Sequence, residues 1–265
     1  MTIAPAGRAA LLRSLHVPGD PLLLANVWDA ATARVVVGAG FPAVATSSGA
    51  VAGTLGYADH EAAPAEEMLA AAGRIAAAVE VPVTVDAEAG YGLEPAELAA
   101  RLLDLGAAGA NVEDTDHRAG GLRPLDVQVA YLAGIRAAAG DALVLNARVD
   151  VFVGLRTRGG GAAEADVLEE AVERGRAYLA AGADCVYPIL VAEESTAKAF
   201  VDAVGGPVNL LALPGALDLA TARACGAARI SLGTSLWHAQ QAWLSAALSA
   251  STRAPCRAEA GLRPG

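Results

Sequence analysis

Lysine is almost absent from this chain of 265 residues: Lys198 is the only one, and the other basic residues are arginines. An aldolase that works through a Schiff base needs a lysine that points inward from a strand. Lys198 lies in the segment STAKAF, whose composition is typical of a helix. The sequence therefore disfavours that class of enzyme.

Cysteines are few and far apart, at Cys185, Cys225 and Cys256. An odd number without a C-x-x-C pair argues against a disulfide framework or a zinc ribbon. No apolar run approaches the length of a membrane span, and charged residues interrupt the first 20 positions where a signal peptide would be apolar. The formal charge of −10 argues against nucleic acid and anionic membranes as partners. We expect a cytoplasmic protein.

Short runs of β-branched and aliphatic residues recur along the chain and predict eight strands. They are Leu22–Val27, Ala43–Ser48, Pro82–Glu88, Ala110–Asp114, Leu143–Asp150, Cys185–Leu190, Val208–Leu213 and Arg229–Gly233. Apart from polar residues near their carboxyl ends, the interiors of these strands are expected to be apolar, as in other parallel sheets.

Helical patterns separate the strands, at 29–38, 64–79, 94–105, 125–139, 164–181, 193–204 and 216–225. Several end in a Gly-Ala step, at Gly38, Gly106, Gly182 and Gly226, where glycine suits the left-handed conformation that stops a helix. Strict alternation of strand and helix implies parallel strands with right-handed crossovers. We predict an α/β protein with a (β/α)₈ TIM barrel; a doubly wound open sheet is the alternative.

The barrel is expected to form a single domain over residues 1–250, since barrels of this kind often reach such a length. Its last element is a mostly apolar helix at about 235–250, which covers the barrel or packs on another subunit. The tail 251–265 is predicted to be disordered. A homo-oligomer, either a dimer or a tetramer, is the expected assembly.

Acidic side chains gather at the carboxyl ends of neighbouring strands, where barrel enzymes have their active sites. Asp86 and Glu88 are two apart on one predicted strand, so they should point the same way, and Glu113 ends the next strand. Three crowded carboxylates repel one another unless a cation intervenes. Oxygen ligands without His or Cys select Mg²⁺, with Mn²⁺ as the other candidate. The alternative is that these acids form salt bridges or helix caps.

Arg148 is expected to enter the same cavity, because Asn146, Arg148 and Asp150 alternate along their strand. A guanidinium binds a carboxylate through two hydrogen bonds and stabilises a developing oxyanion. A structural ion pair with Asp150 or Glu113 is the alternative, and the two roles are compatible. For Asp29, a helix cap is the preferred interpretation.

The segment after the second strand, ATSSGA at 45–50, offers hydroxyl and backbone N–H groups to a ligand carboxylate. An ordinary helix N-cap is the alternative for these serines. Residues 49–61 are predicted to form a long loop that ends in Asp59, His60 and Glu61. A long loop beside an active site is often functional.

Four motifs together resemble the phosphoenolpyruvate mutase/isocitrate lyase superfamily, and the resemblance covers about residues 20–245. They are Thr46–Asp59 (TSSGAVAGTLGYAD), Val85–Gly92 (VDAEAGYG), Ala110–Asp114 (ANVED) and Asn146–Phe152 (NARVDVF). The D-A-[DE]-x-G-Y-G run is the specific one. The resemblance implies a Mg²⁺-dependent enzyme that holds a small oxo acid and stabilises its enolate. It also implies tetramers that exchange the C-terminal helix.

By motif position, Asp86 resembles the residue that binds Mg²⁺ directly, and Glu88 and Glu113 resemble residues that bind it through water.

The substrate-binding residues are carried over in the same way. Ser47, Ser48 and Gly49 resemble the loop that binds the substrate carboxylate. Asp59 resembles the acid that caps the site, and Arg148 resembles the arginine that contacts the substrate.

One segment departs from the family pattern. The lyases carry a loop of the K-K-C-G-H kind after strand four, whose cysteine is the catalytic acid, and here that region reads TDHRAGGLRP at 115–124. Cys185 lies in a predicted strand and does not replace it. His117 or Arg118 is then the candidate for the mobile acid. The mutase branch has a His after strand six, where this chain has Tyr187-Pro188-Ile189.

The leading hypothesis is cleavage of a C–C bond in a small 2-oxo or 2-hydroxy carboxylate. A 2-methylisocitrate- or isocitrate-like acid is preferred to oxaloacetate hydrolysis or decarboxylation. P–C bond chemistry on phosphonopyruvate is an alternative. A flavin- or phosphate-binding barrel using 213–216 and 233–235 leaves the carboxylates unexplained. A barrel that binds an oxo acid without turnover is the non-enzymatic alternative.

Overall fold

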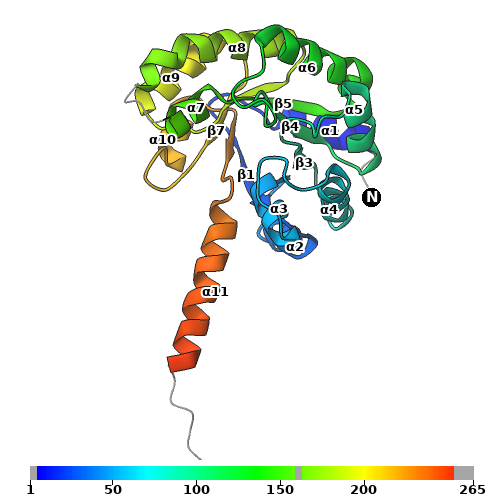
Figure 1. Cartoon of the computed structure of the whole chain (residues 1–265), viewed down its shortest axis with the longest axis vertical. Coiled ribbons are helices and arrows are strands. Elements are labelled where there is room, and N and C mark those ends of the chain that lie inside the picture. The colour runs from blue at the N-terminus through cyan, green and yellow to red at the C-terminus, as the bar shows by residue number, and fades with distance from the viewer. Residues whose placement is uncertain (1–4, 159–162, 254–265) are drawn as a thin grey trace, which may run out of the picture.

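Eight parallel strands form a nearly closed barrel in the computed structural model, which describes residues 5–158 and 163–253 (Figure 1). The strands are β1 (Leu22–Val27), β2 (Val44–Thr46), β3 (Val83–Asp86), β4 (Gly109–Glu113), β5 (Val144–Val149), β6 (Cys185–Pro188), β7 (Asn209–Leu211) and β8 (Arg229–Ser231). Each pairs with its neighbours in chain order, β1 pairs with β8, and a single bridge between Val186 and Val208 joins β6 to β7. The predicted TIM barrel is confirmed, and the open sheet is excluded.

The helices cover the outside of the barrel and alternate with the strands. They are α1 (Pro5–Ser14), α2 (Ala30–Gly38), α3 (Ser48–Leu55), α4 (Ala65–Ala77), α5 (Pro95–Asp104), α6 (Leu125–Ala139), α7 (Val151–Arg158), α8 (Leu168–Ala180), α9 (Glu194–Val204), α10 (Leu219–Ala224) and α11 (Ser235–Arg253), with short 3₁₀ turns η1 (Gly140–Ala142) and η2 (Glu164–Val167). The sequence did not predict α1, α3 or α7.

Helix α4 shows why these segments are helical. Met68, Ala72 and Ile75 recur at intervals of three or four residues and are buried against the barrel, while Glu66 and Arg74 lie outside that face. Asp29 begins α2 as predicted, because its Oδ1 accepts the N–H of Thr32 at 2.7 Å.

Glycines end several helices in the left-handed region. Gly106, Gly182 and Gly226 have φ values of 86°, 102° and 91°, which confirms the predicted stop signals. The prediction for Gly38 is wrong: it lies inside α2, and Gly40 takes the positive φ of 94° instead.

The prediction of apolar strand interiors is also wrong, because a polar layer fills the middle of the barrel. Its side chains are at most 5% exposed and come from six strands: Asn26, Thr84, Asn111, Asn146, Asn209, Arg229 and Ser231. Side chains in a barrel lumen face one another across a short distance, so polar groups there can satisfy each other. Asn146 Nδ2, for example, donates to Asn111 Oδ1 at 2.8 Å.

The predicted loop 49–61 is helical over most of its first half, where α3 forms. Its sequence SGAVAGTL combines two glycines with Ser and Thr, which are weak helix formers, so intrinsic propensity did not indicate a helix. Burial of Ala50, Val51 and Ala52 in the core stabilises it instead. Gly56, at φ 92°, ends the helix.

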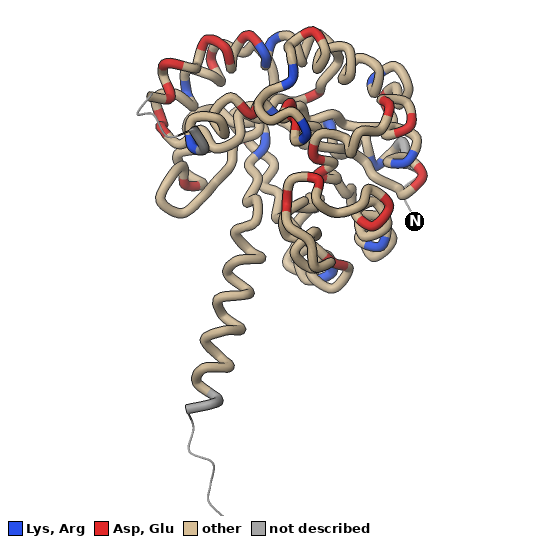
Figure 2. The backbone as a smooth tube through the Cα atoms, viewed as in Figure 1, with Lys and Arg blue, Asp and Glu red and all other residues tan. Residues whose placement is uncertain are grey.

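Helix α11 projects away from the barrel as an isolated rod (Figure 1). The helix predicted at 235–250 is confirmed and continues to Arg253. Figure 2 shows that its described length up to residue 250 has no Lys, Arg, Asp or Glu. Most of the predicted tail, including Cys256, lies outside the described residues. Within residues 5–158 and 163–253, no helix has the length and apolar character needed to cross a membrane.

Candidate active site

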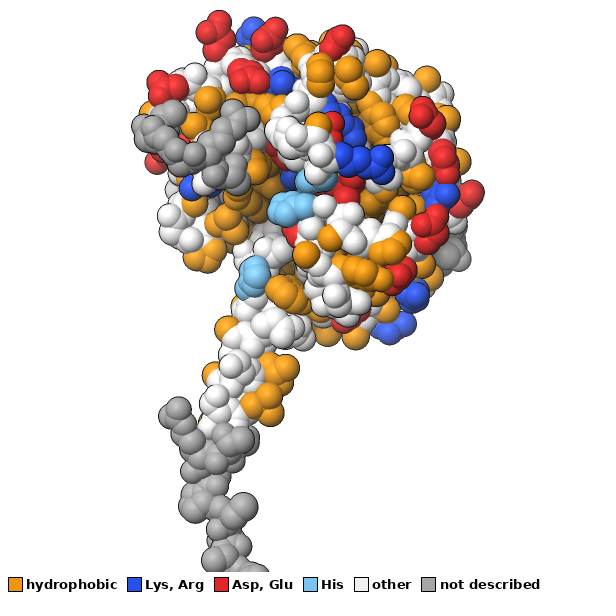
Figure 3. Space-filling view, in the orientation of Figure 1, with side chains coloured by type: hydrophobic (Ala, Val, Ile, Leu, Met, Phe, Trp, Pro, Cys, Tyr) orange, Lys and Arg blue, Asp and Glu red, His pale blue; other side chains and the backbone are white. Residues whose placement is uncertain are grey.

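A cavity of about 180 Å³ lies at the carboxyl ends of the strands. Six of the predicted site residues line it: Ser47, Ser48, Gly49, Asp59, Asp86 and Arg148. The other three, Glu88, Glu113 and His117, lie beside this cavity without lining it. Figure 3 shows histidine, acidic and basic side chains gathered around the hollow of this face.

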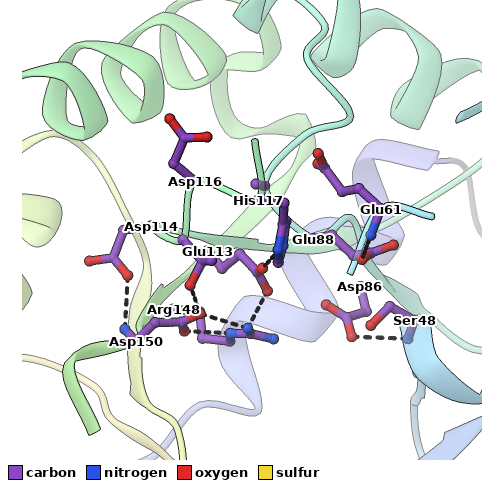
Figure 4. A network of polar contacts seen from close by, with 12 residues as sticks. Ser48, Glu61, Asp86, Glu88, Glu113, Asp114, Asp116, His117, Arg148 and Asp150 are labelled. Atoms are coloured by element: carbon purple, nitrogen blue, oxygen red, sulfur yellow. Dashed lines mark hydrogen bonds and ion pairs between the residues drawn. The ribbon is translucent and has the colours of Figure 1, made fainter. Parts of the chain in front are cut away.

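Asp86 ends β3 and faces the start of α3 (Figure 4). Its Oδ2 accepts the N–H of Ser48 at 3.0 Å, and its own N–H donates to Thr46 Oγ1 at 2.8 Å. Ser47 is the N-cap residue of α3, but its side chain makes no capping bond. The free N–H groups of this helix start, together with the helix dipole, therefore favour negative charge at Asp86 and in the cavity.

Gly49 allows Asp59 to approach the first turn of α3. A Cβ atom at Gly49 would lie 2.7 Å from Asp59 Oδ2 and 3.4 Å from Thr234 Cγ2, so a side chain there would displace the carboxylate. Asp59 Oδ1 is buried and has no hydrogen-bond partner among the described residues. A buried oxygen without a partner is costly, which indicates a ligand or water at this position.

Glu88 does not lie beside Asp86 on one strand, as the sequence predicted. β3 ends at Asp86, and Glu88 follows in the left-handed region at φ 48°. Its Oε2 accepts the N–H of Glu61 at 2.6 Å, and Glu61 Oε1 accepts the N–H of Tyr91 at 2.5 Å. Burial raises the pKa of Glu88 to about 8, and the charges of Asp86 and Asp59 add to this rise.

Arg148 connects the cavity to two buried carboxylates (Figure 4). It binds Asp150 through Nε and Nη2, at 2.6 and 2.7 Å, and its Nη2 also forms an ion pair with Glu113. Both structural ion pairs considered from the sequence are therefore present, while Arg148 also lines the cavity. The acids raise the pKa of Arg148 although its burial opposes this, so its charge is fixed.

Asp150 is held in turn by Asp114, which is fully buried. Asp114 Oδ1 accepts the N–H of Asp150 at 2.8 Å, and its Oδ2 accepts from Tyr178 and Arg174 at 2.6 and 3.1 Å. The sequence analysis missed Arg174 and Tyr178. Their spacing of four residues on a helix was the only available signal, because it places both on one face.

His117 bonds to the Glu113 carboxylate through its Nε2 (Figure 4). Its ring lies tilted against that of His60, with the centroids 5.4 Å apart. The bond to Glu113 raises the pKa of His117, and burial raises the pKa of Glu113 to about 7 against the charge of Arg148. Arg118 is exposed.

The donors of this cavity fit a hard cation bound largely through water. In the part of the chain that the structure describes, no three His, Cys, Asp or Glu side chains converge to hold a metal by themselves. Asp86 Oδ1 has no hydrogen-bond partner among the described residues, and Asp59, whose Oδ1 also has none, lines the same cavity. Mg²⁺ commonly binds one or two carboxylates and keeps several waters, which matches this set.

Several cavity residues were not predicted. Asn26, Asn111 and Ser231 form part of the lining from the barrel interior, and Tyr187 comes from β6. They were missed because the strand interiors were expected to be apolar.

The chain matches known proteins over most of its length. The family model described as phosphoenolpyruvate phosphomutase matches residues 12–252. An uncharacterized protein of Mycobacterium tuberculosis is 32% identical over 83% of this chain and 80% of its own length, and the 2-methylisocitrate lyase of Escherichia coli is 29% identical over 74% and 70%. The crystal structure of a "putative phosphonomutase" from Burkholderia cenocepacia superposes with a TM-score of 0.84 at 38% identity, covering 91% of this chain and 99% of that one.

Proposed function

The chain belongs to the phosphoenolpyruvate phosphomutase family, and from that premise we propose that it is a Mg²⁺-dependent carbon–carbon lyase. Its substrate is a small 2-hydroxy or 2-oxo di- or tricarboxylate of the 2-methylisocitrate or isocitrate kind. One observation carries the proposal: Asp86, the Ser48 N–H and Arg148 surround a single cavity. The similarity to enzymes named 2-methylisocitrate lyase supports the reaction class.

The substrate carboxylate is placed by cationic and N–H groups of the chain itself. The start of α3, at Ser47, Ser48 and Gly49, offers backbone donors, and Arg148 offers a guanidinium. Because Asp150 and Glu113 fix that guanidinium, it needs little reorganisation when substrate binds.

Asp86 is proposed as the direct ligand of Mg²⁺. Asp59, Glu88 and Glu113 would bind the ion through water molecules. When bound there, the cation would be chelated by the 2-hydroxy or 2-oxo carboxylate and would disperse its negative charge. Mn²⁺ has the same preference for oxygen ligands.

Cleavage of a 2-hydroxy acid removes the hydroxyl proton and breaks the bond next to the carbinol carbon. The electron pair stays on the departing carboxylic acid as an enolate-like carbanion, which then takes up a proton. Arg148 stabilises the negative charge. We assign the proton donor to the segment 115–124, with His117 as the candidate, because Glu113 raises the pKa of its imidazole.

A second candidate function is P–C bond chemistry, favoured by the similarity to the "putative phosphonomutase". The cationic groups for a phosphonate would have to come from Arg148 and its surroundings. Within the described residues, Arg148 is the only arginine or lysine that lines the cavity, which favours a carboxylate substrate.

The test is a panel of 2-methylisocitrate, isocitrate, oxaloacetate and phosphonopyruvate, incubated with and without Mg²⁺ and followed by ¹H and ³¹P NMR. We expect a 2-oxo acid and a second carboxylic acid from one hydroxy acid, only with Mg²⁺. Products formed from oxaloacetate alone would indicate a hydrolase or decarboxylase. A changed ³¹P signal of phosphonopyruvate would indicate a P–C bond enzyme. Binding without product would indicate an oxo-acid-binding barrel, and cleavage retained in Asp86→Ala would contradict the mechanism.

The assembly is proposed to be a homo-oligomer in which α11 packs on a second copy. Trp243 is 69% exposed on this helix and Leu248 58%, with Leu244 beside them. Figure 3 shows apolar side chains along this helix, which projects away from the rest of the described structure. An apolar helix surface without charged side chains as far as residue 250 gains most by being buried against another chain.

A further inference from the structure

Beneath the cavity lies an arginine without an acidic partner. Arg229 begins β8, its side chain is fully buried, and it extends into the barrel lumen. Its Nε donates to Ser231 Oγ at 3.3 Å and its Nη2 to Asn111 Oδ1 at 3.2 Å. Its Nη1 is buried and unpartnered, and no carboxylate among the described residues forms an ion pair with it.

A buried guanidinium is normally paired with a carboxylate, because an isolated charge loses its hydration without compensation. Burial lowers the pKa of Arg229, yet arginine stays protonated at neutral pH. The positive charge is thus kept inside the barrel without a counter-ion in the part of the chain that the structure describes. Its hydrogen bonds connect it to the cavity, because its partners Asn111 and Ser231 both line that cavity.

Arg229 also fixes which way the Asn111 amide points. A guanidinium has only donors, so the Asn111 atom that meets it must be the oxygen. The same Oδ1 also accepts from Asn146 Nδ2 at 2.8 Å, which is consistent with this orientation. The Asn111 NH₂ group is left with no acceptor among the described residues.

Asn111 is placed where that free donor meets a ligand. It pairs in register with Asp86, which lies on the adjacent strand, and both residues line the cavity. Within the lining, Asp86 and Asp59 attract cations, whereas Asn111 and Arg148 offer donors to an anion.

We propose that Asn111 is a substrate-binding residue, which donates its amide N–H to an anionic oxygen of a bound carboxylate. Arg229 is the positioning residue that holds this amide in place and adds positive charge from below. The inference rests on the proposed function for the class of ligand, a small carboxylic acid.

Oxalate is a suitable probe, because it is a small planar dicarboxylate that resembles the enolate of a 2-oxo acid and does not react. Its affinity is measured by calorimetry with and without Mg²⁺, for the wild type, Asn111→Ala and Asn111→Asp. We expect about tenfold weaker binding in Asn111→Ala. Asn111→Asp should bind about 100-fold more weakly, because its carboxylate accepts from Arg229 and presents no donor to the ligand.

The matched control is Thr84→Val, an isosteric change at a buried polar residue of the same lumen that does not line the cavity. Its oxalate affinity should equal that of the wild type. Wild-type affinity in both Asn111 variants would overturn the inference, whatever their thermal stability.

The positioning role is tested with Arg229→Lys, which retains the charge but loses the planar fork. It should weaken oxalate binding in the wild-type background and add no further loss in the Asn111→Ala background. Equal losses in both backgrounds would overturn the positioning role. Oxalate binding that is the same with and without Mg²⁺ would contradict the metal part of the proposed function, while the comparison of Asn111 variants would still decide this inference.

Discussion

Arg148 binds Asp150 through two parallel hydrogen bonds, with Nε 2.6 Å from Oδ1 and Nη2 2.7 Å from Oδ2. The same guanidinium also contacts Glu113, so two carboxylates orient the Arg148 side chain at the cavity wall. Planar geometry is what allows this double contact, and an ammonium group cannot reproduce it. In the proposed reaction, this fixed positive charge stabilises the carbanion.

Arg148→Lys should therefore lower kcat/KM by about 100-fold although the charge is retained. Steady-state kinetics on the substrate found in the acid panel measures this. Arg101→Lys is the control, since Arg101 binds Glu66 and Glu97 on the exposed surface. Similar kinetics for the wild type and Arg148→Lys would show that the fork geometry is irrelevant.

Gly49→Ala should reduce kcat/KM at least about tenfold with little change in the thermal midpoint. The new Cβ would meet Asp59 Oδ2 at 2.7 Å and push that carboxylate out of the cavity. Gly38→Ala is the matched control, because Gly38 lies in a helix with nothing within 4 Å of the added atom. An active Gly49→Ala enzyme would show that the position of Asp59 is unimportant.

His16 should make the stability of the protein fall as the medium becomes acidic. Burial, followed by the charge of Arg229, lowers the pKa of His16 to about 4, while its Nδ1 bonds to Leu12 O at 2.8 Å. Between that value and the ordinary 6.5, the unfolded chain binds a proton that the folded chain does not. The contribution of His16 is therefore present above pH 6.5 and is lost progressively as the pH falls toward 4.

Urea unfolding at pH 7 and pH 5 measures this effect. The loss of unfolding free energy between the two values should be about 2 kcal/mol larger in the wild type than in His16→Gln. An identical pH dependence in both proteins would refute the assignment. Comparing the two proteins cancels the titration of other buried groups.

Trp243→Asp should shift the protein toward a smaller assembly in size-exclusion chromatography with light scattering. The charge would fall on the exposed apolar side of α11. Val35→Asp is the control, because Val35 is a 71% exposed apolar residue on α2. A wild-type protein that is monomeric at all concentrations would contradict the packing of α11 on a second copy.

The barrel was predictable from the sequence because each strand is a short run of aliphatic residues between helical segments. All eight strands were found, and β1 has the predicted ends. The site was located because polar residues such as Ser48, Asp86 and Arg148 follow the strands, and the carboxyl ends of parallel strands share one edge.

What the sequence could not show depends on contacts between distant residues. Glu88 leaves the strand because its left-handed backbone lets it bind the N–H of Glu61, 27 residues away. Arg229 is 118 residues from Asn111, so no local pattern could indicate their bond. Helix α3 forms against its intrinsic propensity, because the core buries one of its faces.

The proposed cation site at Asp86 is tested most directly by titrating Mn²⁺ into the protein and following the EPR signal of the free ion. We expect the wild type to bind a single Mn²⁺ that Mg²⁺ displaces, and Asp86→Asn to bind it about 100-fold more weakly. Asp104→Asn, at an exposed position, should bind like the wild type. Unchanged Mn²⁺ affinity in Asp86→Asn would contradict the account.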